Sequence, residues 1–428
     1  MKKLFNLFLL SVILAGCSDN ISENGPQISY EQESLLRTKQ EAVDLAKAVM
    51  TNSTSRSTSE VANVSVICSN EARGYQDTLM YVVNFENNDG FVIVSAPQTV
   101  DPLLGFSFSG NCTTGTKRNE NFEFFLQYAK AYVKEKSILS RSANPPEDHS
   151  FIVKFQHRNG PRVPLEGGQY WPENKYFDNR VTGCGNLALA ELCFYFQSPA
   201  SLQLTFPGKD KDAVNFNWSE MLKHKRSVNS LEQTFPLVAT HMDTCGANYE
   251  AHCDLGRLCR QIAVYTNSSF IDDEFHFTAA TGVTYDGMIN GFTTLFPNKQ
   301  HSGRTPTSSL FNDLDTDGNV AIMFGESNSS DKVSHIWLAD GNYIASITVN
   351  TVKNGVTYPG VASVYKYINH NWGYNGENNG FFLDGIFNPE HSTNIHPGPD
   401  PKPTFPSRSD EKSIYDNVFY VLVKKIRI

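Results

Sequence analysis

The chain has 428 residues, of which 40% are hydrophobic and 19% charged, a composition typical of a globular protein rather than a disordered one. Its formal net charge of -9 argues against nucleic acid as a partner. At about 150 residues per domain, this length predicts two or three domains.

The first residues have the pattern of a bacterial export signal. Lys2 and Lys3 precede an apolar run that is too short to span a bilayer as a stable anchor. The run ends in Leu-Ala-Gly and then Cys17, which resembles the bacterial lipobox. We therefore expect a signal peptide over residues 1–16, a lipid on Cys17 as the only membrane anchor, and a polar tether over residues 17–30.

Residues 31–140 predict a small α+β unit. Apolar residues recur at helical spacing over 34–50 and 121–139. Between these helices, 80–85 and 90–96 form a predicted hairpin, followed by a strand near 100–107. The polar segment Ser140–His149, which contains two prolines, is the predicted domain boundary and the most plausible cleavage site.

Residues 150–428 are expected to form a second domain, with helices first and strands later. The expected helices are 184–196, 235–244 and 255–265, and Trp218–Met221 is expected to be a packed turn. The expected strands are 320–325, 335–339 ending in an Asp340-Gly341 turn, 343–352, 362–368, 380–383 and 417–425. Helix-rich and strand-rich halves predict a two-lobed α+β fold.

Cys184 stands at the start of an apolar helix, directly after Thr182-Gly183. A thiol at this position lies at the positive end of the helix dipole, close to unpaired N–H groups that could also bind an oxyanion. This environment favours the thiolate, which is the nucleophilic form of cysteine. The alternative interpretation is a buried structural cysteine.

A nucleophilic cysteine needs a base, and the base needs an orienting group. His335 opens an apolar strand, which would put an imidazole at the end of a sheet. The Asn371 side-chain carbonyl could accept a hydrogen bond from the far ring nitrogen of His335, and Trp372 could shield that bond from water. A capping histidine and a packed Gly/Asn-rich hairpin are the alternatives.

These motifs together resemble the streptopain family of papain-like cysteine proteases. The matching segments are Thr182-Gly183-Cys184, the strand from His335 to Asp340-Gly341, and Asn371-Trp372-Gly373 with the turn that follows. Residues 31–140 are similar to that family's inhibitory propeptide. The resemblance implies a papain-like protease domain over 150–428, preceded by its propeptide.

The resemblance also implies roles for individual residues. Cys184 would be the nucleophile and His335 the general acid and base, with a thiolate–imidazolium pair at rest. Asn371 would orient His335, and Trp372 would cover that pair. Gln169 would stabilise the oxyanion together with the backbone N–H of Cys184.

The sequence departs from the family pattern in several places. Trp171 follows Gln169 instead of preceding it, and Glu173 stands where tyrosine is expected. Glu191 replaces a glutamine in the helix after Cys184, and residues 247–254 replace the usual substrate-wall segment. Because one oxyanion donor can be worth about 10²–10³ in rate, a misplaced Gln169 would leave a slow enzyme or none.

The prediction is a lipid-anchored cysteine endopeptidase made as a zymogen, with protein or peptide substrates and its own propeptide as inhibitor. We expect no cofactor, no metal site and no nucleic acid; the Asp313–Gly318 stretch lacks the twelfth-position glutamate of an EF-hand. One alternative is a surface binding protein whose catalytic function has decayed. Another is an amidase or acyltransferase on the same fold, since fold does not fix function. The eight cysteines leave the disulfide pairing open.

Overall fold

The computed structural model describes residues 36–53, 60–69, 77–114, 119–139, 148–178, 180–234, 250–271, 280–326, 334–387 and 418–424. The predicted signal peptide, Cys17 and the expected helix at 235–244 lie outside these ranges. No helix among the described residues is long and apolar enough to cross a membrane.

The N-terminal unit has the predicted order of helix, antiparallel strands and helix. A short helical turn, η1 (Glu86–Asn88), joins the two central strands, and Asn87 adopts the left-handed backbone conformation there, which asparagine tolerates well. The elements are α2 (Lys39–Ser53), β1 (Val61–Cys68), β2 (Thr78–Phe85), β3 (Phe91–Ser95), β4 (Leu103–Ser107) and α3 (Glu120–Leu139).

The rest of the chain places helices before most of its strands, as expected. Its helices are α4 (Cys184–Phe196), α5 (Trp218–Thr234), α6 (Glu250–Tyr265), α7 (Tyr285–Leu295), η3 (Thr307–Ser309) and α8 (Leu310–Asp315). The main strands are β5 (Asp148–Asn159), β12 (Val320–Glu326), β13 (Ser334–Lys353), β14 (Val356–Tyr358), β15 (Ala362–Asn371), β16 (Gly380–Leu383) and β17 (Val418–Lys424). The short strands are β6 (Ser201–Gln203), β7 (Ala213–Asn215), β8 (Ser269–Ile271), β9 (Ala280–Gly282), β10 (Gln300–His301) and β11 (Thr305–Pro306).

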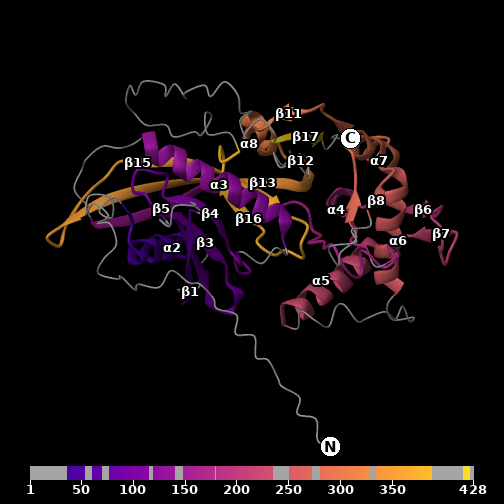
Figure 1. Ribbon diagram of the computed structural model, residues 1–428, viewed down its shortest axis with the longest axis horizontal. Coiled ribbons are helices and arrows are strands. Elements are labelled where there is room, and N and C mark those ends of the chain that lie inside the picture. Colours follow the sequence, from indigo (N-terminus) through magenta and orange to yellow (C-terminus); the bar gives the residue numbers. More distant parts are fainter. Residues whose placement is uncertain are drawn as a thin grey trace, which may run out of the picture.

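One large antiparallel sheet joins the two units. Its order is β1-β2-β3-β4-β16-β15-β13-β12-β17-β10, and the junction is the pairing of Phe106 in β4 with Phe381 in β16. Strand β5, which begins at the end of the predicted cleavage segment, pairs with β13 from Asp148 to Asn159. In Figure 1, α4–α7 gather at one end of this sheet, and α2 with β1–β4 lies at the other.

The two faces of the central strands pack into different cores. Successive side chains of a strand point to opposite faces. In β13, Trp337 and Ala339 join the core that contains α3, whereas Ile336 and Leu338 join the core that contains α4, α6 and α7. His335 shares the face of Trp337, so the alternation directs its side chain toward α3.

Four local expectations were wrong or incomplete. Asp340-Gly341 is not a turn: β13 is one long strand with an irregularity between Ala339 and Gly341 in its pairing with β15. Trp218 begins helix α5 rather than a packed turn. The segment from Asp148 belongs to β5 and not to a linker, and neither β5 nor α7 was predicted. The α+β class itself is confirmed.

Candidate active site

Cys184 is the first residue of α4, as the sequence predicts. The preceding Gly183 has φ +88, and a Cβ there would lie 2.6 Å from the carbonyl oxygen of Thr281, so only glycine fits this turn. Residues 185–194 of α4 are buried, which fixes the helix firmly. The turn therefore holds the half-buried Cys184 thiol at the helix N-terminus.

Gln169 lies beside this turn. Its side-chain Oε1 accepts a hydrogen bond from the Gly183 N–H at 2.9 Å, and its backbone carbonyl accepts one from the Thr182 N–H at 3.0 Å. Because an N–H needs an acceptor, these contacts orient the amide with its oxygen toward Gly183. The Gln169 Nε2 group is buried and has no hydrogen-bond partner among the described residues. An oriented, unused donor next to Cys184 has the property that an oxyanion hole requires.

The Cys184 thiol is not ionised in this structure at neutral pH. Burial and the nearby Glu120 carboxylate together raise its pKa to about 11, although the backbone N–H of Ile336 acts in the opposite direction. The thiolate–imidazolium pair is therefore not formed in the intact chain, and for the cut enzyme it stays a prediction. Glu120 comes from α3, so the N-terminal unit contributes to this suppression.

His335 is held by α3 rather than by Cys184 or Asn371. Its Nδ1 is 3.2 Å from Oδ1 of Asn121, and its ring lies 4.9 Å from the ring of Phe124. Burial lowers the pKa of His335 to about 4, so the ring is neutral at pH 7. No hydrogen bond joins His335 to Cys184 within the described parts of the chain.

Asn371 is buried but is engaged elsewhere. Its Nδ2 donates to the Leu165 carbonyl at 3.0 Å and to Oε1 of Glu191 at 3.1 Å. Its Oδ1 accepts from the Gly373 N–H and from the Asn379 side chain. The structure thus brings Gln169 to Cys184 but does not bring Asn371 to His335.

Trp372 is fully buried beneath α3. Its ring lies 5.9 Å from Phe122 and 5.6 Å from Phe125, and it stacks on His370 at 4.8 Å. Its indole N–H donates to the carbonyl of Asn378. The indole therefore covers His370 and the underside of α3 in this conformation, not a His335–Asn371 pair.

Sequence reasoning missed Asn121. The side chain of Asn119 already caps α3, because its Oδ1 accepts from the Phe122 N–H at 2.9 Å. The Asn121 side chain is therefore free to reach the sheet, where its Nδ2 donates to the carbonyls of Ile336 and Trp372 at 3.1 and 2.7 Å. The sequence shows only an asparagine at a helix start, with no signal for the strands that it contacts.

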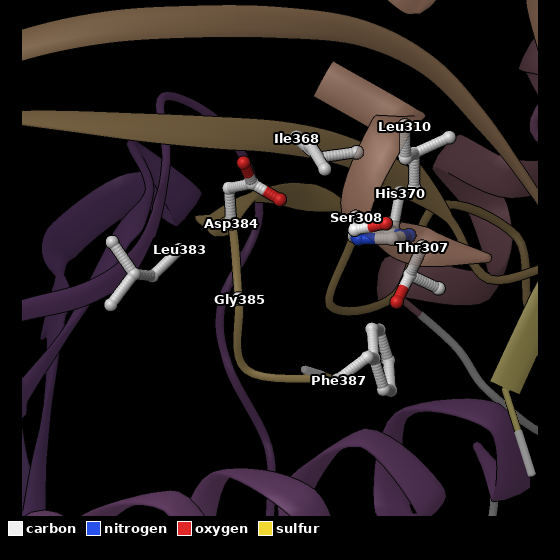
Figure 2. A pocket seen from close by; sticks show the side chains of 9 residues that line it. All are labelled: Thr307, Ser308, Leu310, Ile368, His370, Leu383, Asp384, Gly385 and Phe387. Atoms are coloured by element: carbon white, nitrogen blue, oxygen red, sulfur yellow. The ribbon is translucent and has the colours of Figure 1, made fainter. Parts of the chain in front are cut away.

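A separate pocket lies between η3, α8 and the β15–β16 strands (Figure 2), lined by Thr307, Ser308, Leu310, Ile368, His370, Leu383, Asp384, Gly385 and Phe387. A serine, a histidine and an acid together suggest a second hydrolytic site. However, the Trp337 indole N–H donates to Nδ1 of His370 at 2.9 Å, which leaves the proton on Nε2. Because burial also lowers the pKa of His370 to about 3, that nitrogen cannot act as a base toward Ser308.

The other described cysteines show no arrangement of groups that would support catalysis or metal binding. Cys112, Cys193 and Cys259 are buried thiols, and Cys253 is disulfide-bonded. Among the described residues, no group of three or more His, Cys, Asp or Glu side chains could hold a metal ion. Cys184 is thus the free thiol that lies beside an unused hydrogen-bond donor.

The comparisons with known proteins identify the family of the chain. The model of the family described as Peptidase C10 matches residues 168–382, about half of the chain. This chain belongs to the Peptidase C10 family. A second model, described as Spi protease inhibitor, matches residues 35–133. The predicted resemblance to the streptopain family is confirmed, and so is the prediction of a cysteine-type peptidase.

Two solved structures from Prevotella intermedia are similar to the chain. A fragment of prointerpain A is 16% identical, with a TM-score of 0.47, and the match covers 85% of this chain and 98% of that one. Active wild-type interpain A is 15% identical, with a TM-score of 0.35, over 63% of this chain and 95% of that one. No curated protein matches the chain. With its Peptidase C10 domain behind an inhibitor-type propeptide, the chain is a cysteine protease zymogen.

Proposed function

We propose that the chain is an exported, lipid-anchored endopeptidase in which Cys184 is the nucleophile, His335 the general acid and base, and Gln169 an oxyanion donor. Asn371 orients His335 in the active form, and Trp372 shields that contact. The observation that carries the proposal is the unused Gln169 Nε2 group next to the thiol at the start of α4.

The chemistry follows from these roles. His335 takes the proton of Cys184, and the thiolate attacks the peptide carbonyl carbon. The oxygen of the tetrahedral intermediate becomes negative and accepts hydrogen bonds from Gln169 Nε2 and the Cys184 N–H. His335 then donates its proton to the departing amine, which leaves a thioester. Water, deprotonated by His335, attacks the thioester and releases the acid and the thiol.

Latency rests on helix α3. Asn121 binds His335 and two backbone carbonyls of the strands beneath it, and Phe124 packs on the His335 ring. While α3 stays in place, His335 cannot pair with Cys184. A cut between α3 and β5 would let α3 leave, because β5 keeps the new N-terminus paired with β13.

The proposed location rests on the sequence alone. The apolar segment ending in Leu14-Ala15-Gly16-Cys17 supports cleavage before Cys17 and lipidation of its thiol, which would anchor the protein in a bacterial, most simply an outer, membrane. Cleavage of the propeptide would then release the mature protease. Metabolic labelling with a fatty acid, compared with a Cys17→Ala variant, tests the anchor: labelling of both or neither contradicts it.

The decisive experiment follows casein hydrolysis and Cys184 alkylation by iodoacetamide in intact and cut chain. The cut chain should hydrolyse casein and react at Cys184 well below pH 7, whereas the intact chain should do neither. Cys184→Ala should lower hydrolysis by about 10⁴-fold or more, since it removes the nucleophile. If the cut chain leaves casein intact and its Cys184 titrates near pH ~8.5, the protein is instead a binding protein without catalysis.

A further inference from the structure

The backbone just before Gln169 is held by two buried glutamates. The Gly167 N–H donates to Oε1 of Glu191 at 3.1 Å, and the Gly168 N–H donates to Oε1 of Glu173 at 2.9 Å. Both carboxylates are at most 1% exposed. Two consecutive peptide N–H groups are therefore bound by side chains from different parts of the chain.

A buried lysine completes this arrangement. Lys225 on α5 lies 2.8 Å from Oε1 and 3.0 Å from Oε2 of Glu173, and its side chain is 1% exposed. Its Nζ also donates to Oδ1 of Asn375 at 2.8 Å. A buried ion pair is costly to form unless its remaining hydrogen-bonding capacity is used, and here the backbone and Asn375 use it.

The same groups tie Gly167 and Gly168 to the loop after Trp372. The Asn375 N–H donates to the Gly167 carbonyl at 2.7 Å. A Cβ at residue 168 would lie 2.1 Å from Oδ1 of Asn375, so only glycine permits this approach. Glu191 also accepts from Asn371, and it therefore contacts both the backbone before Gln169 and the asparagine proposed to orient His335.

We propose that Glu173, Lys225 and Glu191 are positioning residues that fix the Gly167-Gly168 backbone and, through it, the oxyanion donor Gln169. They touch no reacting atom and act only through Gln169 and Asn371. The inference rests on the proposed function. It also assigns a role to Glu173 and Glu191, the two residues at which this sequence departs from its family's usual tyrosine and glutamine.

The test separates oxyanion stabilisation from thiol reactivity. Peptide hydrolysis passes through an oxyanion, whereas alkylation of Cys184 by iodoacetamide does not. In the cut enzyme, we expect Glu173→Gln/Lys225→Met, which removes both charges together, to lower kcat about 10-fold or more, because small misplacements of a catalytic group are costly. KM and the alkylation rate should stay within about twofold.

Four further variants sharpen the result. Glu191→Leu should lower kcat in the same way, while Glu191→Gln, which keeps the acceptor oxygen, should restore it. In a Gln169→Ala background, the Glu173→Gln/Lys225→Met change should cost less than about twofold, because the positioned donor is already gone. Asp254→Asn, an acid-to-amide change at the Arg257 cluster, is the matched control and should leave kcat unaffected.

Several outcomes would overturn the inference. These are an unchanged kcat, a fall in alkylation parallel to the fall in kcat, and full additivity with Gln169→Ala. If the double variant does not fold, Asn375→Ala tests the same inference, because it removes the contact to Lys225 but leaves the ion pair between Glu173 and Lys225. If the cut wild-type chain has no peptidase activity, the proposed function is wrong. If the cut wild type is active but the variants have the same kcat, only this inference is wrong.

Discussion

The two ends of the catalytic site are in different states. At the Cys184 end, Gln169 is hydrogen-bonded to the turn before the thiol through contacts that lie entirely within the protease domain. At the His335 end, the ring is bound by Asn121 and Phe124 of the propeptide. Under the proposed roles, latency needs no unformed oxyanion hole, because it suffices to hold His335 away from Cys184.

This difference predicts which changes affect chemistry and which affect only latency. Changes at the Cys184 end should alter the cut enzyme. Changes at the His335 end that lie in α3 should alter only the intact chain, because the proposed cut removes α3. The four predictions below test that division, beginning with the largest effect.

Gln169→Ala should lower kcat of the cut enzyme by about 10²–10³-fold, because it removes one oxyanion donor. The alkylation rate of Cys184 should not change, since that reaction develops no oxyanion. Steady-state kinetics and peptide mass spectrometry measure the two quantities. Gln261→Ala is the matched control, because Gln261 is also buried but bonds to Thr205 away from the site. An equal loss in both Gln variants would mean that packing, not oxyanion binding, is responsible.

His335 should make the intact chain sensitive to acid. Its pKa is lowered from 6.5 to about 4 by burial, so the folded state disfavours the charged ring. The neutral ring's contribution to the free energy of unfolding is fully present above pH 6.5 and is lost as the pH falls through about 4. The loss amounts to roughly 3 kcal/mol. Urea unfolding of the intact Cys184→Ala chain at pH 7 and pH 4 measures this loss.

The matched variant for this effect is His335→Leu, which removes the titrating ring and keeps an apolar contact to Phe124. Between pH 7 and pH 4, the free energy of unfolding of this variant should fall by roughly 3 kcal/mol less than that of the protein with His335. His370, whose pKa is also lowered, remains in both proteins and cancels in the comparison. Parallel pH profiles for the two proteins would show that His335 is not buried as a neutral ring.

Asn121→Ala should weaken latency without affecting the mature enzyme. It removes the hydrogen bonds to the carbonyls of Ile336 and Trp372 and the contact to His335. Each hydrogen bond contributes about 1 kcal/mol net, so losing them should raise the population of uncut chains in which His335 pairs with Cys184 by ~10–100-fold. The alkylation rate of Cys184 at pH 7 in the uncut chain reports that gain.

The control for this variant is Asn111→Ala; Asn111 also lies in the propeptide but donates to the exposed side chain of Asn88, away from the sheet strands that Asn121 contacts. It should leave the alkylation rate of the uncut chain unchanged. After cleavage, the Asn121→Ala enzyme should match the wild type in kcat. A lower kcat in the cut enzyme would place Asn121 in folding rather than in latency.

The sequence was sufficient for the features that depend on local pattern. The thiol at the start of α4, the strand from His335 and the two-unit layout followed from spacing and turn residues. What it could not show depends on which surfaces meet. Asn121 gives no sign that it reaches the sheet, and the buried Glu173 and Lys225 lie 52 positions apart in the chain. The ionisation states of Cys184 and His335 in the intact chain likewise depend on burial, which the sequence does not show.

The smallest effect is expected for Glu191→Gln. Burial raises the pKa of Glu191 well above 4.5, and the negative charges of Asp340 and Glu173 raise it further. The carboxyl therefore favours its protonated form, and its contribution to stability is lost as the pH rises above about 4.5. Glutamine has the shape of that protonated form and keeps the acceptor for Gly167 and Asn371. At pH 7 the intact variant should be as stable as the wild type or more stable, by about 1 kcal/mol.

The pH dependence distinguishes this explanation from a simple isosteric exchange. The advantage of Glu191→Gln should grow from pH 5 to pH 8, as measured by urea unfolding of the Cys184→Ala chain. Glu173→Gln is the informative contrast, because it leaves Lys225 as an uncompensated buried charge and should destabilise the protein at every pH in that range. A Glu191→Gln variant that loses stability toward pH 8 would mean that Glu191 is ionised and that its charge is used in holding Gly167.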